Sequence, residues 1–142
     1  MSGFTKRSID VNGTQLNIHS GGGGETEYVL IHGIGHRRQA WGEVPQRLND
    51  RGYDVYVVDL PGHGTSRVPT RPDGYSMRST AEQLERFFAS LGFERPHVVG
   101  NSLGGAVALE LAHTGAARTA TVISPAGFFP VHHLPNIAVN LL

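Results

Sequence analysis

Apolar and polar residues alternate through residues 8–11 and again through residues 14–19. An alternation with a period of two places the apolar side chains on one face of a β-strand. The two alternating segments are joined by Asn12-Gly13, a pair that favours the tight type I′ turn of a hairpin. The chain is therefore predicted to begin with an antiparallel β-hairpin.

Four short apolar runs follow, and each is typical of a strand that is buried on both faces. They occupy residues 27–33, 54–59, 97–100 and 119–124. Helical signals lie in the segments between these runs. The predicted helices cover residues 44–50, 79–91 and 103–113.

The clearest helix is the second one, whose apolar residues recur at the spacing i, i+3, i+4, i+7 and form one stripe. The stripe consists of Leu84, Phe87, Phe88 and Leu91. Ser79 and Glu82 have the spacing of a capping box at its start, and Gly92 is a typical stop. Residues 103–113 are apolar on nearly every side, so this helix is predicted to be buried.

Strands and helices alternate along the chain after the hairpin, and this order is typical of βαβ units. The predicted fold class is α/β, with an open, mostly parallel sheet to which the N-terminal hairpin adds an antiparallel part. A chain of 142 residues is long enough for one domain with a hydrophobic core.

The composition narrows the range of partners. Lys plus Arg and Asp plus Glu both number 12, so the formal net charge is zero and nothing favours nucleic acid as a partner. The absence of cysteine excludes disulfides and thiolate metal sites. No segment has the form of a signal peptide, and none approaches the ~18 apolar residues of a membrane span. We therefore expect a cytoplasmic protein that contacts no membrane.

The sequence Gly100-Asn101-Ser102-Leu103-Gly104 fits the pattern G-x-S-x-G between a predicted strand and a predicted helix. So tight a turn strains its central residue and requires small residues two positions away. It would raise the Ser102 hydroxyl at the carboxyl end of the sheet, where open α/β sheets bind ligands. The Leu103 amide, at the start of the helix, is predicted to stabilise an oxyanion.

Two glycine-rich loops follow the two strands that precede this motif. They are His32-Gly33-Ile34-Gly35 and the segment DLPGHGTS at residues 59–66. Together with the serine motif, and in this order along the chain, they resemble the α/β-hydrolase superfamily. The resemblance covers roughly residues 8–125 and corresponds to the N-terminal portion of that fold.

The resemblance implies a serine hydrolase that acts on a small-molecule, ester-like substrate. Ser102 would be the catalytic nucleophile, which attacks a carboxylic ester or related acyl bond and forms an acyl-enzyme. The backbone N–H groups of Ile34 and Leu103 would bind the oxyanion, and neither a metal nor an organic cofactor is implied. A serine at this position argues against relatives that use aspartate there, such as haloalkane dehalogenases and epoxide hydrolases. Residues 1–127 would form part of the hydrolase core, and residues 128–142 the start of a lid or cap segment.

In this superfamily the catalytic acid and histidine follow the nucleophile along the chain. After the serine the only acidic residue is Glu110, inside the predicted buried helix, and the histidines are His113, His132 and His133. The chain is therefore expected to be truncated before its acid and base and to be nearly inactive alone. The uncharged strand 119–124 would be an exposed sheet edge, open to a complementing chain or to self-association.

Other functions stay open at this point. A non-catalytic binding module, a C–C bond hydrolase or a lactonase of the same fold would carry the same motifs. A dinucleotide-binding site is disfavoured, because Arg38 stands where the third glycine after Gly33 and Gly35 is needed. His32 and His36 lie in a glycine-rich loop rather than on a helix, so they are expected to be ordinary loop residues and not metal ligands. The remaining candidates are expected to be structural: Asp59, His63 and Trp41.

Overall fold

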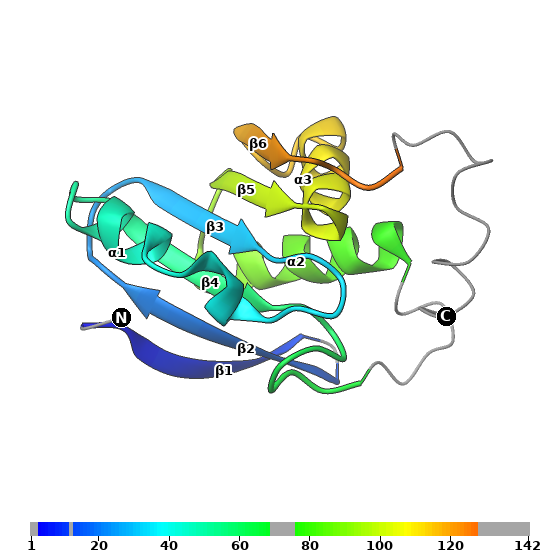
Figure 1. Cartoon of the computed structure of the whole chain (residues 1–142), viewed down its shortest axis with the longest axis horizontal. Coiled ribbons are helices and arrows are strands. Elements are labelled where there is room, and N and C mark those ends of the chain that lie inside the picture. The colour runs from blue at the N-terminus through cyan, green and yellow to red at the C-terminus, as the bar shows by residue number, and fades with distance from the viewer. Residues whose placement is uncertain (1–2, 12, 69–75, 128–142) are drawn as a thin grey trace.

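Strands from both halves of the chain form one mixed sheet in the computed structural model, which describes residues 3–11, 13–68 and 76–127 (Figure 1). The strands are β1 (Thr5–Val11), β2 (Thr14–Gly21), β3 (Glu27–Ile31), β4 (Asp54–Asp59), β5 (His97–Asn101) and β6 (Thr119–Ile123). The helices of this part are α1 (Val44–Asn49), α2 (Met77–Leu91) and α3 (Leu103–His113), with a short 3-10 helix, η1 (Arg38–Trp41). The strand order across the sheet is β1-β2-β4-β3-β5-β6.

The predicted hairpin at the start of the chain is confirmed. β1 and β2 pair antiparallel, with Val11 opposite Thr14. Gly13 adopts a φ of 82°, and its N–H donates to Asp10 Oδ1 at 2.9 Å, which holds the turn. β2 pairs antiparallel with β4, whereas β4, β3, β5 and β6 run parallel to one another. The fold class is therefore as predicted: α/β, with a mostly parallel open sheet and an antiparallel N-terminal hairpin.

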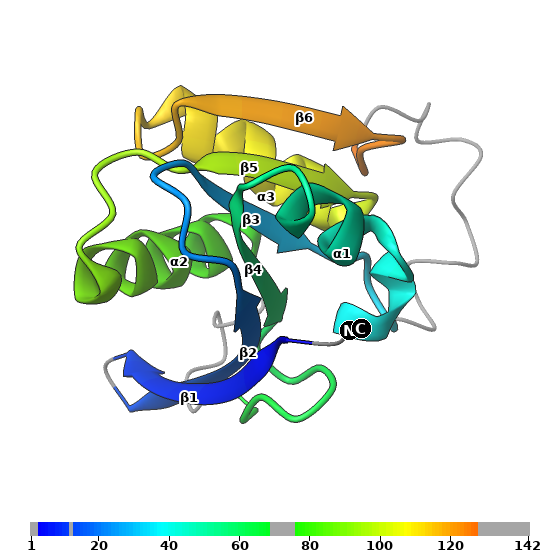
Figure 2. The same cartoon turned by 90° about the vertical axis from the view of Figure 1, so that its left-hand side faces the viewer.

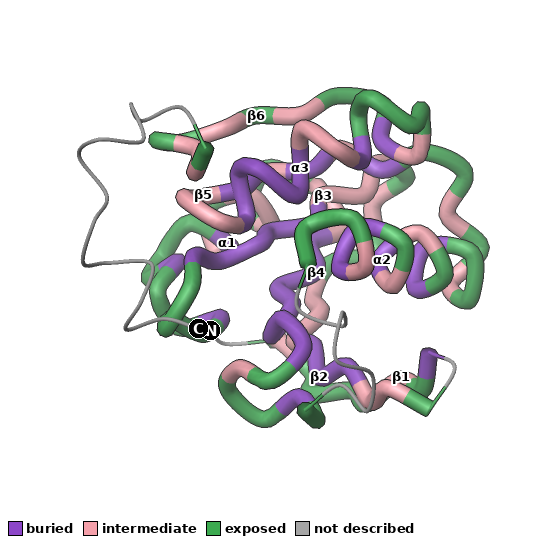
Figure 3. The backbone as a smooth tube through the Cα atoms, turned by 90° about the vertical axis from the view of Figure 1, so that its right-hand side faces the viewer, coloured by how far each residue is buried: buried purple, intermediate pink, exposed green. Residues whose placement is uncertain are grey.

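Helices cover both faces of the sheet, with α2 and α3 on one face and α1 with η1 on the other (Figure 2). Successive side chains of β3 point to opposite faces. Val29 and Ile31 belong to the larger core, which also contains Leu84 of α2. Leu30 belongs to the smaller core, together with Trp41 of η1. The central strands β3 and β4 are buried along most of their length (Figure 3), as their apolar runs predicted.

The start of α2 differs from the prediction. The N-cap is Ser76, whose hydroxyl accepts a hydrogen bond from the Ser79 N–H at 3.1 Å. Ser79 therefore lies inside the helix, and the predicted capping box with Glu82 is wrong; Glu82 pairs instead with Arg78 at 3.3 Å. The end of the helix is as predicted, because Gly92 takes the left-handed C-cap conformation with a φ of 76°.

The two edges of the sheet differ in charge. β1, at one edge, carries Lys6, Arg7 and Asp10. β6, at the other edge, has no charged residue, and Ile123 at its end is 47% exposed. Within the described ranges no strand pairs with the outer side of β6, so the predicted open edge is confirmed there. The predicted lid segment, residues 128–142, lies outside the described residues, and the domain boundary before it stays a prediction.

We expect the purified chain to self-associate through the β6 edge, because an uncharged edge strand offers unpaired N–H and C=O groups to another chain. Thr121→Lys, in the exposed middle of β6, should shift the population towards monomer. Ser8→Lys on the charged edge β1 is the matched control and should leave the distribution unchanged. Sedimentation velocity at several concentrations measures both effects. A wild-type chain that stays monomeric throughout would contradict the expectation.

Candidate active site

Ser102 stands at the turn between β5 and α3, with φ 52° and ψ −114°. Non-glycine residues rarely adopt a positive φ, and such strain persists only where neighbouring contacts enforce it. The Ser102 N–H donates to the Ile123 carbonyl at 3.0 Å. The Ser102 carbonyl accepts from the N–H groups of Ala106 at 3.1 Å and Ala126 at 2.9 Å. The strained turn is therefore held by β6, by the segment after it and by the first turn of α3.

The glycines around Ser102 are required by close backbone contacts. A side chain on Gly100 would overlap the backbone of Gly104, and a side chain on Gly104 would overlap the carbonyls of Ile31 and His32. These contacts bring α3 directly against the ends of β3 and β5. The small residues that the sequence pattern demanded are thus explained by backbone packing on both sides of the serine.

The loop that carries Ile34 touches the Ser102 turn. A methyl group at Gly33 would lie 3.1 Å from Ser102 Cβ, so the loop after β3 packs against the serine without a side chain between them. Among the described residues, the N–H groups of Ile34 and Leu103 have no hydrogen-bond acceptor. The two predicted oxyanion donors therefore belong to segments that contact Ser102, and both are unpaired within this part of the chain.

His32 links this loop to the loop after β4. Its side chain is buried, its Nδ1–H donates to the Gly33 carbonyl at 2.7 Å, and its Nε2 accepts from the Leu60 N–H at 3.0 Å. Burial lowers the pKa of His32 below its ordinary value. The imidazole is therefore neutral, with both nitrogens committed to backbone groups, and it has no free nitrogen with which to act as a base for Ser102.

Asp59, at the end of β4, makes a second link between the same loops. Its fully buried carboxylate accepts from the Arg38 N–H at 2.8 Å and forms an ion pair with the Arg38 side chain. The Thr65 N–H and hydroxyl donate to the same carboxylate at 3.2 and 3.3 Å. The Ser66 hydroxyl donates to the Asp59 carbonyl at 2.6 Å. Asp59 is thus a structural residue, as expected, and its charge is compensated by Arg38.

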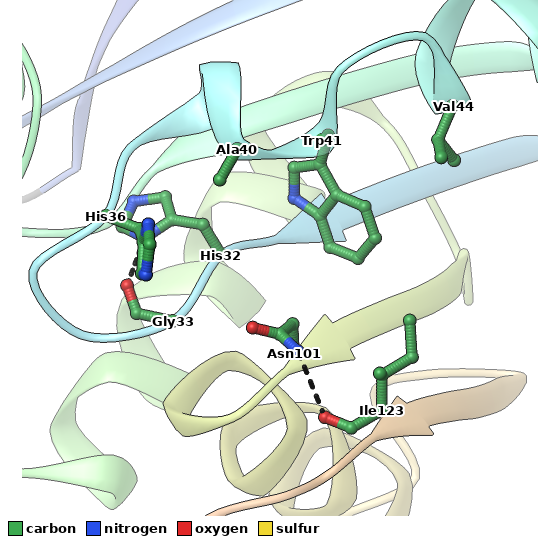
Figure 4. A pocket seen from close by; sticks show the side chains of 8 residues that line it. All are labelled: His32, Gly33, His36, Ala40, Trp41, Val44, Asn101 and Ile123. Carbon is green, nitrogen blue, oxygen red and sulfur yellow. Dashed lines mark hydrogen bonds between the residues drawn. The ribbon is translucent and has the colours of Figure 1, made fainter.

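A cavity of about 350 Å³ lies at the carboxyl ends of β3, β5 and β6 (Figure 4); Asn101, the residue before Ser102, lines it, and Ser102 itself does not. It is lined by His32, Gly33, His36, Ala40, Trp41, Val44, Asn101 and Ile123. Asn101 Nδ2 donates to the Ile123 carbonyl at 3.3 Å, which leaves Oδ1 available to an occupant of the cavity. Trp41 belongs to the smaller core, as predicted, but it also forms one wall of this cavity and so contacts whatever fills it.

The structure brings no catalytic base to Ser102 within the described residues. The Ser102 hydroxyl has no hydrogen-bond partner there. Glu110 and His113 stand on α3 at about 12 and 16 Å from Ser102 along the helix axis, given a rise of about 1.5 Å per residue. No group of three or more potential metal-ligating side chains occurs in the same ranges. In the described part of the chain the site therefore consists of a half-buried serine, two unpaired amides and a cavity.

Sequence reasoning treated His32 as an ordinary loop residue and missed what it does. Its hydrogen-bond partner Leu60 is 28 residues away along the chain. Arg38 was noted only as a break in a glycine pattern, although it compensates the buried Asp59. Their positions were the available signal. His32 stands near the end of the apolar run 27–33, and Arg38 pairs with Asp59, the last residue of the run 54–59.

Residues 29–140 match the protein family described as the alpha/beta hydrolase fold. This match covers most of the chain and includes both glycine-rich loops and the Ser102 turn. The chain therefore belongs to the alpha/beta hydrolase fold family. No helix in the described ranges is long and apolar enough to cross a bilayer.

Relatives with several different activities resemble this chain. The dihydrolipoyllysine-residue acetyltransferase component of the acetoin cleaving system of Cupriavidus necator is 38% identical over 121 residues, which cover 84% of this chain and 32% of that protein. The 2-hydroxy-6-oxononadienedioate/2-hydroxy-6-oxononatrienedioate hydrolase of Paraburkholderia phymatum is 31% identical over 152 residues, covering 97% of this chain and 51% of the relative. A solved membrane phospholipase A, described as a novel bacterial virulence factor, matches with a TM-score of 0.82 and 31% identity, covering 90% of this chain and 42% of that one. The chain spans between about a third and a half of the length of these proteins.

Substituting Gly100 tests the packing of the Ser102 turn. Gly100→Ala should lower the free energy of unfolding by about 3 kcal/mol or more, because the new methyl group overlaps the backbone of Gly104. Gly115→Ala is the matched control, since Gly115 has a φ of 80° but no atom within 4 Å of an added Cβ, and should cost only about 1–2 kcal/mol. Urea denaturation measures both values. Equal losses would show that backbone overlap at the turn is not decisive.

Substituting Asp59 tests the buried ion pair that joins the end of β4 to the segment after β3. Asp59→Asn leaves the Arg38 guanidinium buried without a counter-charge and should cost about 3–5 kcal/mol of stability. Glu43→Gln removes the carboxylate of an exposed ion pair with Arg47 and should cost about 0–1 kcal/mol. Thermal and urea denaturation of both variants provide the comparison. A loss at Asp59 no larger than that at Glu43 would contradict a structural role for the buried pair.

Proposed function

We propose that this chain carries the nucleophile and the oxyanion site of a serine hydrolase that cleaves a carboxylic ester or a related acyl bond. One observation carries the proposal: Ser102 is held in a strained conformation directly before the unpaired N–H of Leu103, and it packs against Gly33, whose neighbour Ile34 also has an unpaired N–H. Strain of this kind costs about 1–3 kcal/mol and is concentrated at functional sites.

In the proposed reaction, Ser102 Oγ attacks the carbonyl carbon of the substrate and loses its proton to a base. The carbonyl electrons move onto oxygen, and the amides of Ile34 and Leu103 stabilise the resulting anion. When the tetrahedral species collapses, the C–O bond to the leaving group breaks, and the departing alkoxide receives the proton. Water then attacks the acyl-enzyme in the same way and releases the carboxylic acid.

No base is hydrogen-bonded to the Ser102 hydroxyl among the described residues. A serine hydroxyl is a weak nucleophile without a hydrogen-bonded base. His32 uses both ring nitrogens for backbone groups, and Glu110 stands two turns along α3. We therefore propose that the acid and the base belong to a further part of the protein or to a complementing chain. The outer edge of β6, beside the Ser102 turn, is where such a part would add its strand.

The relatives support hydrolysis in general without deciding which bond is cleaved. The name phospholipase A describes hydrolysis of an ester, and that protein is 31% identical to this chain. The Paraburkholderia phymatum hydrolase, which is similar over 97% of this chain, favours a second candidate, the hydrolysis of a C–C bond next to a carbonyl. Both reactions need a nucleophile and an oxyanion site in the same place. The two candidate reactions differ in the substrate that the 350 Å³ cavity would hold, so identifying that substrate would distinguish them.

A fluorophosphonate probe tests the nucleophile. The folded chain should be labelled slowly at Ser102, as detected by mass spectrometry of the modified peptide, because the oxyanion site is present and the base is not. Ser102→Ala should abolish labelling. Ser124→Ala is the matched control, since Ser124 also has a positive φ, of 44°, and should leave labelling unchanged. A folded chain that takes no label would favour the non-catalytic binding module.

Turnover should be very low. Loss of the base costs about 10⁶ in kcat in a comparable serine enzyme. The isolated chain should therefore hydrolyse an activated p-nitrophenyl ester barely above the Ser102→Ala background. Robust turnover that depends on Ser102 would show that the chain already holds its base.

A further inference from the structure

The loop that bears the Ile34 amide is fastened at both ends to the loop after β4. Two residues before Ile34, His32 bonds to the Leu60 N–H; four residues after it, Arg38 bonds to Asp59. Both fastening residues are buried, whereas Ile34 itself is 37% exposed. The position of the Ile34 N–H relative to Ser102 therefore depends on two buried polar contacts rather than on burial of Ile34.

The two hydrogen bonds of the His32 ring can form together in one protonation state only. The Gly33 carbonyl can only accept, so Nδ1 carries a proton, and the Leu60 N–H can only donate, so Nε2 carries none. A proton added to Nε2 would face the Leu60 N–H, donor against donor, in a buried place without water to separate them. Protonation and the closed loop are therefore incompatible.

The groups around the His32 ring have opposing effects on its pKa. Burial is the largest effect on the pKa of His32 and lowers it, and the nearby His63 and His36 lower it further. The Gly33 carbonyl and the Asp59 carboxylate raise it, but Asp59 is itself paired with Arg38. The His63 ring, 5.2 Å from the His32 ring, bonds through Nδ1 to the Pro61 carbonyl and so supports the same loop.

We propose that His32 is a positioning residue that holds the Ile34 amide beside Ser102 only while its imidazole is neutral, so that the oxyanion site opens reversibly in acid. The catalytic meaning of this switch rests on the proposed function; the switch itself does not.

The direction of the pH dependence follows from the proton balance. A histidine freed by opening of the loop titrates near 6.5, whereas His32 in the closed loop binds a proton only at lower pH. Above that range neither form binds the proton, and closure is fully stable. As the pH falls below 6.5, the open form takes up a proton that the closed form does not, so closure weakens about tenfold per pH unit until His32 titrates in place.

Hydrogen exchange of the Leu60 amide tests the switch in the intact chain. Its protection factor, corrected for intrinsic exchange, should fall about tenfold per pH unit below 6.5 in the wild-type protein. In His32→Gln the side-chain carbonyl accepts from Leu60 in place of Nε2 and does not titrate, so the slope should disappear. His113→Gln, a change at an exposed histidine at the end of α3, is the matched control and should keep the wild-type slope.

A second readout uses the serine. The ratio of fluorophosphonate labelling rates, His32→Gln over wild type, should stay constant while the closed form of the wild type predominates. It should rise by up to about tenfold per pH unit once acid has made the open form the larger population. Dividing the two rates removes the pH dependence of the probe chemistry, which both proteins share. Nitrogen-15 spectra of His32 should also show the Nδ1–H form at pH 7.

Each outcome bears on one proposal. A Leu60 slope that is the same in wild type and His32→Gln, or an Nε2–H form of His32 at pH 7, would overturn the switch whether or not Ser102 reacts. A histidine-dependent Leu60 slope without any labelling at Ser102 would support the switch and contradict the serine hydrolase. If His32→Gln does not fold, the wild-type tautomer and the comparison of wild type with His113→Gln still decide the matter.

Discussion

The structure depends on one close backbone contact, that of α3 with the carboxyl ends of β3 and β5. Gly104 lies against the carbonyls of Ile31 and His32, and Gly100 lies against Gly104, so no side chain fits between the helix and the two strands. This approach forces the chain to reverse within a few residues, and Ser102 takes a strained conformation with a positive φ at the point of reversal. The strained serine, the amide of Leu103 that is unpaired among the described residues, and the burial of α3 are consequences of the same contact.

The second constraint is that the loops around this contact are held by polar groups in a buried place. A buried polar group is costly unless it is paired, so loops that place polar groups there must be shaped to pair them. His32 and Asp59 do this by bonding to backbone groups and to Arg38 across the boundary between two loops. These hydrogen bonds fix the two loops relative to each other. In the proposal above, they also make the position of the Ile34 N–H depend on the protonation state of the His32 imidazole.

The sequence predicted those parts of the fold that are decided locally. Alternation on both sides of Asn12-Gly13 predicted the hairpin, and the apolar runs predicted the parallel strands, because periodicity and turn chemistry act over a few residues. The cap of α2 was misplaced by one turn because Ser76 and Ser79 both satisfy the local rule. Contacts between distant segments were invisible: nothing near His32 in the sequence points to Leu60, and Asp59 and Arg38 are 21 residues apart.

The candidate site likewise has features that the local sequence predicted and features that depend on contacts between distant segments. The glycine spacing around Ser102 identified the strained turn, because the steric demand lies within one pentapeptide. The wall formed by Trp41, and the contact between the Ile34 loop and the serine, arise from the packing of separate strands and could not be derived from spacing. No base contacts the Ser102 hydroxyl within residues 3–11, 13–68 and 76–127, and no pattern within that part of the chain signalled one.

The open edge of the sheet and the incomplete site meet at Ile123. Its carbonyl accepts both from the Ser102 N–H and from Asn101 Nδ2, so the end of β6 helps to hold the strained turn. In the described part β6 is paired on one side only, and a strand paired on one side is less firmly fixed than a central one. A strand added along its outer side would therefore do more than cover the edge: it would stiffen the acceptor that positions Ser102. Pairing along the outer side of β6 and the conformation of Ser102, the proposed nucleophile, would be coupled through this one carbonyl.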